Sequence, residues 1–182
     1  MSFRILGAAL AVILGLVACS DESPPAAFSD IHFANGPKIR LDVAAVDIVS
    51  EFSPTFQAPQ VEQNFPIPPQ RAIENWVHDR LQANNPGSPY RVRVTIIDAS
   101  ARELEGGGRY TARASVKVDV VDAHGFAVRT AHAEAVRSVT VDPDASPDDR
   151  DYAWYGMTRD LIGSLAGELD HQIRSTFYPY VQ

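Results

Sequence analysis

Residues 109–121 read RYTARASVKVDVV, and this stretch decides the fold. Every second residue from Tyr110 to Val120 is apolar, whereas the residues between them are polar or charged from Arg109 to Asp119. Such alternation is typical of a β-strand with one covered face and one open face. It is the longest alternation in the chain, so we expect this strand to lie centrally in a sheet, with a neighbour on each side.

The segments that flank this strand are predicted to be strands as well. Residues 122–125 (DAHG) predict a hairpin turn, after which residues 126–141 continue as a long strand. Residues 90–100 also alternate, and the three glycines at 106–108 predict a flexible turn. One face of the 126–141 strand carries only small side chains at Ala131, Ala133 and Ala135. We expect these alanines to let a helix approach the sheet closely.

Two amphipathic helices are predicted to supply that covering layer. The first spans residues 70–83, and its apolar stripe consists of Ile73, Trp76, Val77 and Leu81. The second begins after Ser146, a favourable N-cap that is followed by Pro147, and extends to about Phe177. Its stripe consists of Trp154, Met157, Leu161, Leu165, Leu169, Ile173 and Phe177. Trp76 and Trp154 are both expected in the layer between helices and sheet.

Residues 39–52 predict the remaining strand, with a phase slip at Ala44–Ala45 that we interpret as a bulge. The element order is then β-α-β-β-β-α. The predicted fold class is α+β: a two-layer sandwich in which a mostly antiparallel four-stranded sheet carries both helices on one face. A single domain spanning residues 39–182 accounts for all of these elements.

The first residues predict a targeting signal. Arg4 is followed by an apolar run, Ile5–Val17, that has the length of a signal-peptide core and is short for a membrane-spanning helix. The run ends in LVAC, with the only cysteine of the chain at Cys19. This motif resembles a bacterial lipobox, while an ordinary secretory leader with a chance cysteine is the alternative.

The resemblance to a lipobox implies cleavage between Ala18 and Cys19 and acylation of Cys19, including a palmitate-type chain. The predicted organisation is therefore a signal peptide at 1–18, a lipidated flexible tether at 19–38, and a periplasmic domain from residue 39. The residue after Cys19 is Ser20, whereas Asp at this position resembles an inner-membrane retention signal of enteric bacteria. We therefore expect attachment to the outer membrane, with the inner membrane as the alternative.

The segment 53–69 contains five prolines and cannot form a regular helix or a central strand. Its apolar residues are Phe56, Val61, Phe65 and Ile67. Two interpretations remain open: they cap one end of the core, or they are exposed together as a contact surface for a partner. We expect the contact surface, because the prolines order the segment before it docks.

Five cations are predicted on the open face of the sheet: Arg91, Arg93, Arg109, Arg113 and Lys117. They can form a second contact surface for a carboxylate- or phosphate-bearing partner, such as a lipid headgroup or another envelope protein. The alternative is an ordinary solvated sheet face. Arginine dominates the basic residues of the whole chain, which weakens the first interpretation.

Composition excludes several functions. The chain has 182 residues, of which 45% are hydrophobic and 21% charged, and its formal net charge is −7. This acidic balance argues against binding to a nucleic acid backbone. One cysteine excludes a multi-cysteine metal site. His132 and Glu134 share a strand face and supply at most half of a metal site, so no metal or cofactor is predicted.

No catalytic motif is found either. Ser164 lies between Gly163 and Gly167 in a predicted helix, not at the strand-to-helix turn of a serine hydrolase. The triple glycine lacks the lysine and helix start of a phosphate loop. No pair of acidic residues can be argued to converge from their spacing. The chain is therefore expected not to be an enzyme.

A lipobox before a β-α-β-β-β-α domain resembles two groups of envelope proteins, namely the auxiliary lipoproteins of lipid-trafficking ABC transporters and the lipopolysaccharide-assembly lipoprotein. FPIPP at 65–69 with Trp76, and Trp154-Tyr155 at the head of the last helix, resemble a set of uncharacterised proteobacterial lipoproteins. The resemblance implies a non-catalytic accessory role in an envelope transport or assembly complex. The alternative is a self-standing structural or ligand-binding lipoprotein.

Overall fold

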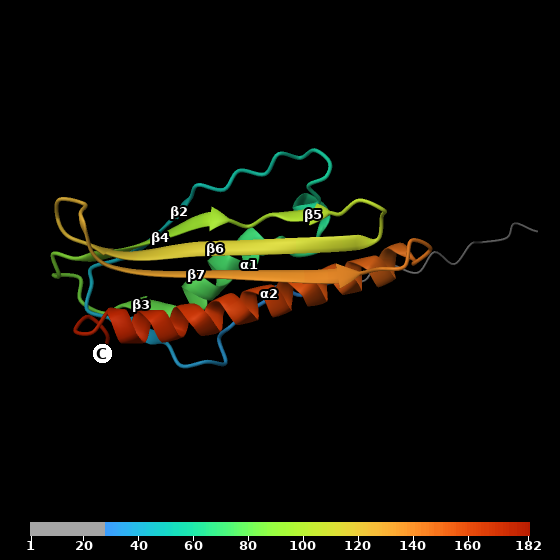
Figure 1. Ribbon diagram of the computed structural model, residues 1–182. Coiled ribbons are helices and arrows are strands. Elements are labelled where there is room, and N and C mark those ends of the chain that lie inside the picture. The colour runs from blue at the N-terminus through green and yellow to red at the C-terminus, as the bar shows by residue number, and fades with distance from the viewer. Residues whose placement is uncertain (1–27) are drawn as a thin grey trace, which may run out of the picture.

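The computed structural model describes residues 28–182, in which two helices cover one face of a five-stranded sheet (Figure 1). The central strand is β6 (Arg109–Val121), which pairs with β7 (Ala127–Thr140) on one side. On its other side it pairs with β4 (Arg91–Asp98) and β5 (Ala101–Glu103). The prediction that β6 has neighbours on both sides is confirmed.

The sheet is mixed rather than wholly antiparallel. All pairs with β6 are antiparallel, whereas the edge strand β2 (Val46–Ser50) runs parallel to β4. The chain between β2 and β4 contains α1 (Pro69–Arg80), so this parallel pair has a helical crossover. The predicted α+β two-layer sandwich with both helices on one face is confirmed, but the sheet has five strands rather than the predicted four, because the short strand β5 pairs with β6.

The predicted strand at 39–52 is two strands in two different sheets. Ile39–Leu41 forms β1, which pairs with the three-residue β3 (Leu81–Ala83) that directly follows α1. Between β1 and β2 the backbone leaves the small sheet, and the Ala44 N–H donates to Tyr90 O (2.8 Å). The phase slip at Ala44–Ala45 is therefore a change of sheet and not a bulge. The first helix also ends earlier than predicted, at Arg80.

The last helix, α2 (Pro147–Thr176), packs along β7 (Figure 1). Its 30 residues give a length of about 45 Å, which matches the 14 residues of β7. Ser146 caps the helix as predicted, because its hydroxyl accepts a hydrogen bond from the Asp149 N–H (3.2 Å). Trp76 and Trp154 both lie buried in the layer between helices and sheet, as expected.

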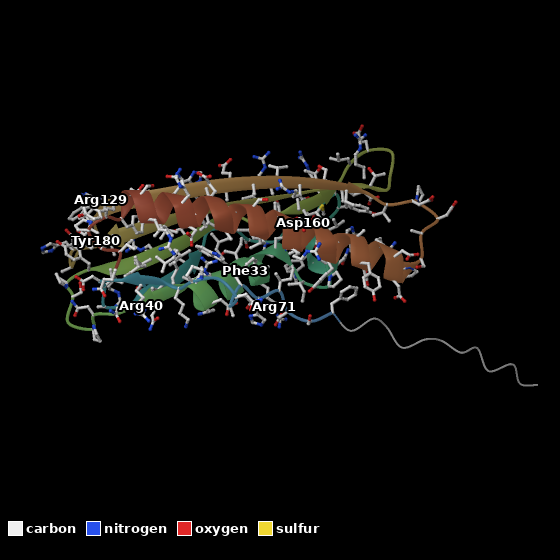
Figure 2. All side chains as sticks on the ribbon, turned by 90° about the horizontal axis from the view of Figure 1, so that it is seen from below. Phe33, Arg40, Arg71, Arg129, Asp160 and Tyr180 are labelled. Atoms are coloured by element: carbon white, nitrogen blue, oxygen red, sulfur yellow. The ribbon has the colours of Figure 1, made fainter. Side chains whose placement is uncertain are left out.

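The segment 28–38, predicted as part of the tether, packs on the helices. Phe28 contacts the rings of Tyr152 and Tyr155 (centroid distances 5.0 and 5.2 Å), and Ile31 is buried in the core. Figure 2 shows this segment, with Phe33, on the same side of the molecule as α2. Residues 28–38 therefore pack against the same core as the elements that follow residue 39.

Asp79 of α1 holds the segment 28–38 in place through hydrogen bonds. It accepts a hydrogen bond from the Phe33 N–H (2.7 Å) and lies 3.1 Å from Nδ1 of His32. Burial alone would raise the pKa of Asp79, but these hydrogen bonds outweigh it and hold the pKa below its ordinary value. The docking of residues 28–38 is thus polar as well as apolar.

Candidate functional site

A cleft of about 580 Å³ opens between α1 and the segment that leads from β2 into it. We call this hollow the cleft. Its volume lies within the range of small-molecule sites in proteins. Side chains from the β2–α1 segment line one wall, and side chains from α1 line the other. The lining residues from the segment are Phe52, Pro54, Phe56, Glu62, Gln63 and Pro68, and those from α1 are Gln70, Arg71, Glu74, Asn75 and His78.

Hydrogen bonds to β5 position the inner wall of the cleft. The Val61 N–H donates to Ala101 O (2.9 Å), and the Ala101 N–H donates to Oε2 of Glu62 (3.2 Å). Glu62 begins a short 3₁₀ turn, Glu62–Asn64, and is only 2% exposed. Its second carboxylate oxygen, Oε1, has no hydrogen-bond partner among the described residues. A buried carboxylate with one free oxygen is costly, and such groups often mark functional sites.

Phe56 stands at the mouth of the cleft. Its side chain is 69% exposed, and its backbone φ is +55°, a left-handed conformation that is uncommon for a residue other than glycine. An exposed aromatic ring and a sparsely populated backbone conformation coincide at this position. Both are frequent at ligand contacts.

The four apolar residues predicted as one contact surface do not form one. Phe65 and Ile67 are both only 4% exposed, and the Phe65 ring stacks on Trp154 (centroids 4.9 Å apart). Val61 is half-buried against the core. Of the four, only Phe56 is exposed. The prolines prevent a regular strand in this segment. Phe65 is nevertheless buried, because its ring packs on the large apolar surface of Trp154.

Acidic residues partly neutralise the cationic face of the sheet. The alternation of the sequence did not predict that these acidic residues lie there. Arg91 donates to both carboxylate oxygens of Asp47 on β2 (2.9 and 2.7 Å), and this hydrogen bonding raises the pKa of the Arg91 guanidinium. Lys117 lies 3.3 Å from Asp119, and Arg113 lies 4.0 Å from Asp98. Among the described residues, Arg93 and Arg109 form no ion pair. Mixed pairing of this kind favours the solvated-face interpretation over a concentrated cationic platform.

Ser115, His132 and Glu134 meet on this same face. Ser115 Oγ lies 3.1 Å from His132 Nε2 and 3.4 Å from Glu134 Oε1. The Glu134 carboxylate faces that same Nε2 (3.7 Å), whereas in a hydrolase triad the acid holds the other ring nitrogen. Glu134 therefore does not orient His132 as a base for Ser115. Within residues 28–182, no group of three or more His, Cys, Asp or Glu side chains is placed to hold a metal ion.

The predicted lipidation residue Cys19 and the cleavage-site residue Ala18 lie outside the described residues. No helix in the described part of the chain is both long and apolar enough to cross a bilayer.

Comparison with known proteins gives only distant similarities. No family model matches the chain, and no curated protein matches it. A minor lipoprotein from Acinetobacter baumannii is 12% identical, with a TM-score of 0.41 over 75% of this chain and 96% of that one. Uncharacterized lipoprotein B from Nitrosomonas europaea is 13% identical, with a TM-score of 0.36 over 75% of this chain and 86% of that one. At TM-scores this low, the similarity carries no conclusion about the function of this chain.

Sequence reasoning missed Glu62 and Gln63. A signal was present, because three polar residues, Glu62–Asn64, lie between Val61 and Phe65 in a proline-rich apolar segment. A carboxylate in an apolar segment is either exposed to water, paired with a cation or hydrogen-bond donor, or buried in a functional site. Which of these holds depends on the distance to Ala101, and the sequence does not give that distance.

Proposed function

We propose that this chain is a non-catalytic lipoprotein of the bacterial cell envelope that binds an envelope component through the cleft. In this proposal, acyl chains on Cys19 anchor it to the periplasmic face of the outer membrane. The LVAC motif after an apolar run of signal-peptide length supports the anchor. More than one acyl chain is needed for durable anchoring, and lipobox processing would supply this.

The cleft carries the binding part of the proposal. It is the site where an apolar surface, an unpaired buried carboxylate oxygen and an exposed aromatic ring coincide. The sheet face supports a second contact less well, since Arg91, Arg113 and Lys117 already face carboxylates. A lipid headgroup or a protein partner at that face stays a prediction.

Two roles are compatible with a binding lipoprotein. As an accessory component of an envelope lipid-transport or assembly complex, the domain would dock on membrane proteins. As a self-standing ligand-binding lipoprotein, it would need no such machine, and the size of the cleft favours this second role. Identifying the proteins bound to the chain separates the two.

Replacement of the anchor residue is expected to abolish lipidation. In cells fed a radioactive fatty acid, the wild-type chain should be labelled and should sediment with outer membranes. Cys19→Ser should carry no label, because a hydroxyl is a poorer nucleophile than a thiol. It should be soluble or keep its leader. Label that persists in Cys19→Ser would refute the lipoprotein proposal.

Removal of the exposed ring at the cleft is expected to weaken partner capture without unfolding the domain. The full-length chain is cross-linked in cells, purified, and its partners are quantified by mass spectrometry. Phe56→Ser should lose most of a specific envelope partner. Phe126→Ser is the matched control, because Phe126 is equally exposed (71%) but lies at the β6–β7 turn and does not line the cleft. Equal loss in both variants would refute a role for the cleft in docking.

A further inference from the structure

We infer that the cleft binds an amphipathic amine: a small ligand in which a protonated amino group adjoins a short apolar part. This inference rests on the proposed function, since it names the ligand class of the same site. It follows from three properties of the lining: which hydrogen-bonding groups are already used, the sign of the charges, and the position of the apolar wall.

The three amide side chains of the lining each use one N–H inside the protein. The Gln63 amide donates to Gln60 O (3.2 Å), and the Gln70 amide donates to Glu74 Oε1 (3.0 Å). The Asn75 amide donates to Ile31 O (3.2 Å). The only other nitrogen-bearing side chains of the lining are Arg71, treated below, and His78, which lies at the exposed rim.

Two acceptors of the same lining are unused. Glu62 Oε1 and Gln63 Oε1 are both buried and have no hydrogen-bond partner among the described residues. Because buried acceptors are nearly always satisfied in folded proteins, a ligand for this cleft should bring hydrogen-bond donors. Glu62 Oε1 itself is covered by surrounding atoms, so in this inference the Glu62 carboxylate acts on the ligand through its negative charge at the cleft wall.

The charges select the same ligand. Glu62 and Glu74 bring two carboxylates to the lining. The one guanidinium there, that of Arg71, lies 2.5 Å from Asp30 Oδ2, so its charge is offset by a residue outside the lining. Arg71 is labelled in Figure 2 near the start of the N-terminal segment that carries Asp30. The excess negative charge attracts a cation, and it disfavours a carboxylate or phosphate ligand.

The apolar wall of the cleft indicates that the ligand also has an apolar part. Phe52, Pro54 and Phe56 line the cleft on the side of the β2–α1 segment, and Phe56 is largely exposed at its mouth. A short alkyl or aryl group can lie against these rings while its amino group faces Glu62 and Glu74. Burying such a group against the wall adds affinity in proportion to the apolar area removed from water.

The probe for this inference is hexan-1-amine, with hexan-1-ol and hexanoate as matched ligands that differ only in the polar head. The full-length protein in lipid nanodiscs is titrated by calorimetry, and empty nanodiscs give the blank. We expect the amine to bind about tenfold more tightly than the alcohol, because the carboxylates of the lining attract its positive charge, and we expect hexanoate to bind more weakly than either.

Variants assign the effect to the cleft. Glu62→Gln keeps an acceptor for the Ala101 N–H and should cost the amine about tenfold while leaving the alcohol unchanged. Glu105→Gln, in the exposed turn before β6, removes an equal charge away from the lining and should change nothing. Phe56→Ala should weaken amine and alcohol alike. If Glu62→Gln does not fold, Glu74→Gln should show the same selective loss, smaller in size.

Equal binding of hexanoate and amine, amine binding that neither glutamate variant alters, or no binding by any of the three compounds would each overturn the inference. The result is separable from the fate of the proposed function. Amine binding by a chain that takes no fatty-acid label would refute the lipoprotein and leave the ligand class standing. Fatty-acid labelling without amine binding would refute the ligand class and leave the lipoprotein proposal standing.

Discussion

Phe65→Ala is expected to lower the free energy of unfolding by about 3–5 kcal/mol, the usual cost of removing a buried aromatic ring. The ring is 4% exposed and stacks on Trp154, so its loss leaves a cavity between the β2–α1 segment and α2. Phe56→Ala should change the same quantity by less than about 0.5 kcal/mol, because that ring is 69% exposed. Urea denaturation followed by circular dichroism measures both.

The pair of variants decides between the two interpretations of this segment. A large loss for Phe65→Ala with none for Phe56→Ala places the first ring in the core and leaves the second for binding. Comparable large losses in both would mean that Phe56 packs against the core as well. Unchanged stability of Phe65→Ala would contradict the stacking on Trp154.

Ala114→Leu is expected to destabilise the fold by about 1–3 kcal/mol, because it adds volume where helix and sheet are in contact. Ala114 of β6 is fully buried and lies directly opposite Ala135 of β7, in the face of the sheet that the helices cover. Val136→Leu is the control, since Val136 is 43% exposed on the open face and should change stability by less than about 0.5 kcal/mol.

Calorimetric melts of the two variants report the outcome. A normal melting temperature for Ala114→Leu would mean that the sheet and the helices leave room for a larger side chain. In that case the small residues of β6 and β7 would not explain the close approach of α2.

Long periodic segments were predictable from the sequence because the period itself reports burial. β6, β7 and α2 each repeat their pattern over many residues, so a few exceptions do not hide it. The three-residue strands β3 and β5 were not predicted, and β1 was not separated from β2, since strands this short show no period of their own. Each is defined by its partner strand, and that pairing is decided by the packing of the whole chain.

The candidate site was predictable only in part, for a related reason. The proline-rich segment was singled out as a site, and it does line the cleft. Yet the sequence could not distinguish Phe65, which meets Trp154, from Phe56, which meets solvent. The acidic partner of Arg91, Asp47, was hidden for the same reason, because the parallel pairing of β2 with β4 joins distant parts of the chain.

If Cys19 is lipidated as proposed, the docking of Phe28 on α2 limits how far the domain can lie from the membrane. Eight residues lie between Cys19 and Phe28, so in any conformation these two residues are about 30 Å apart at most. A lipid on Cys19 would therefore hold the N-terminal end of α2 within that radius of the bilayer. Asp30, two residues beyond Phe28, pairs with Arg71 at the cleft, so the cleft lies near the same end. Tethered in this way, the domain would draw its ligand from the headgroup layer or the water next to it.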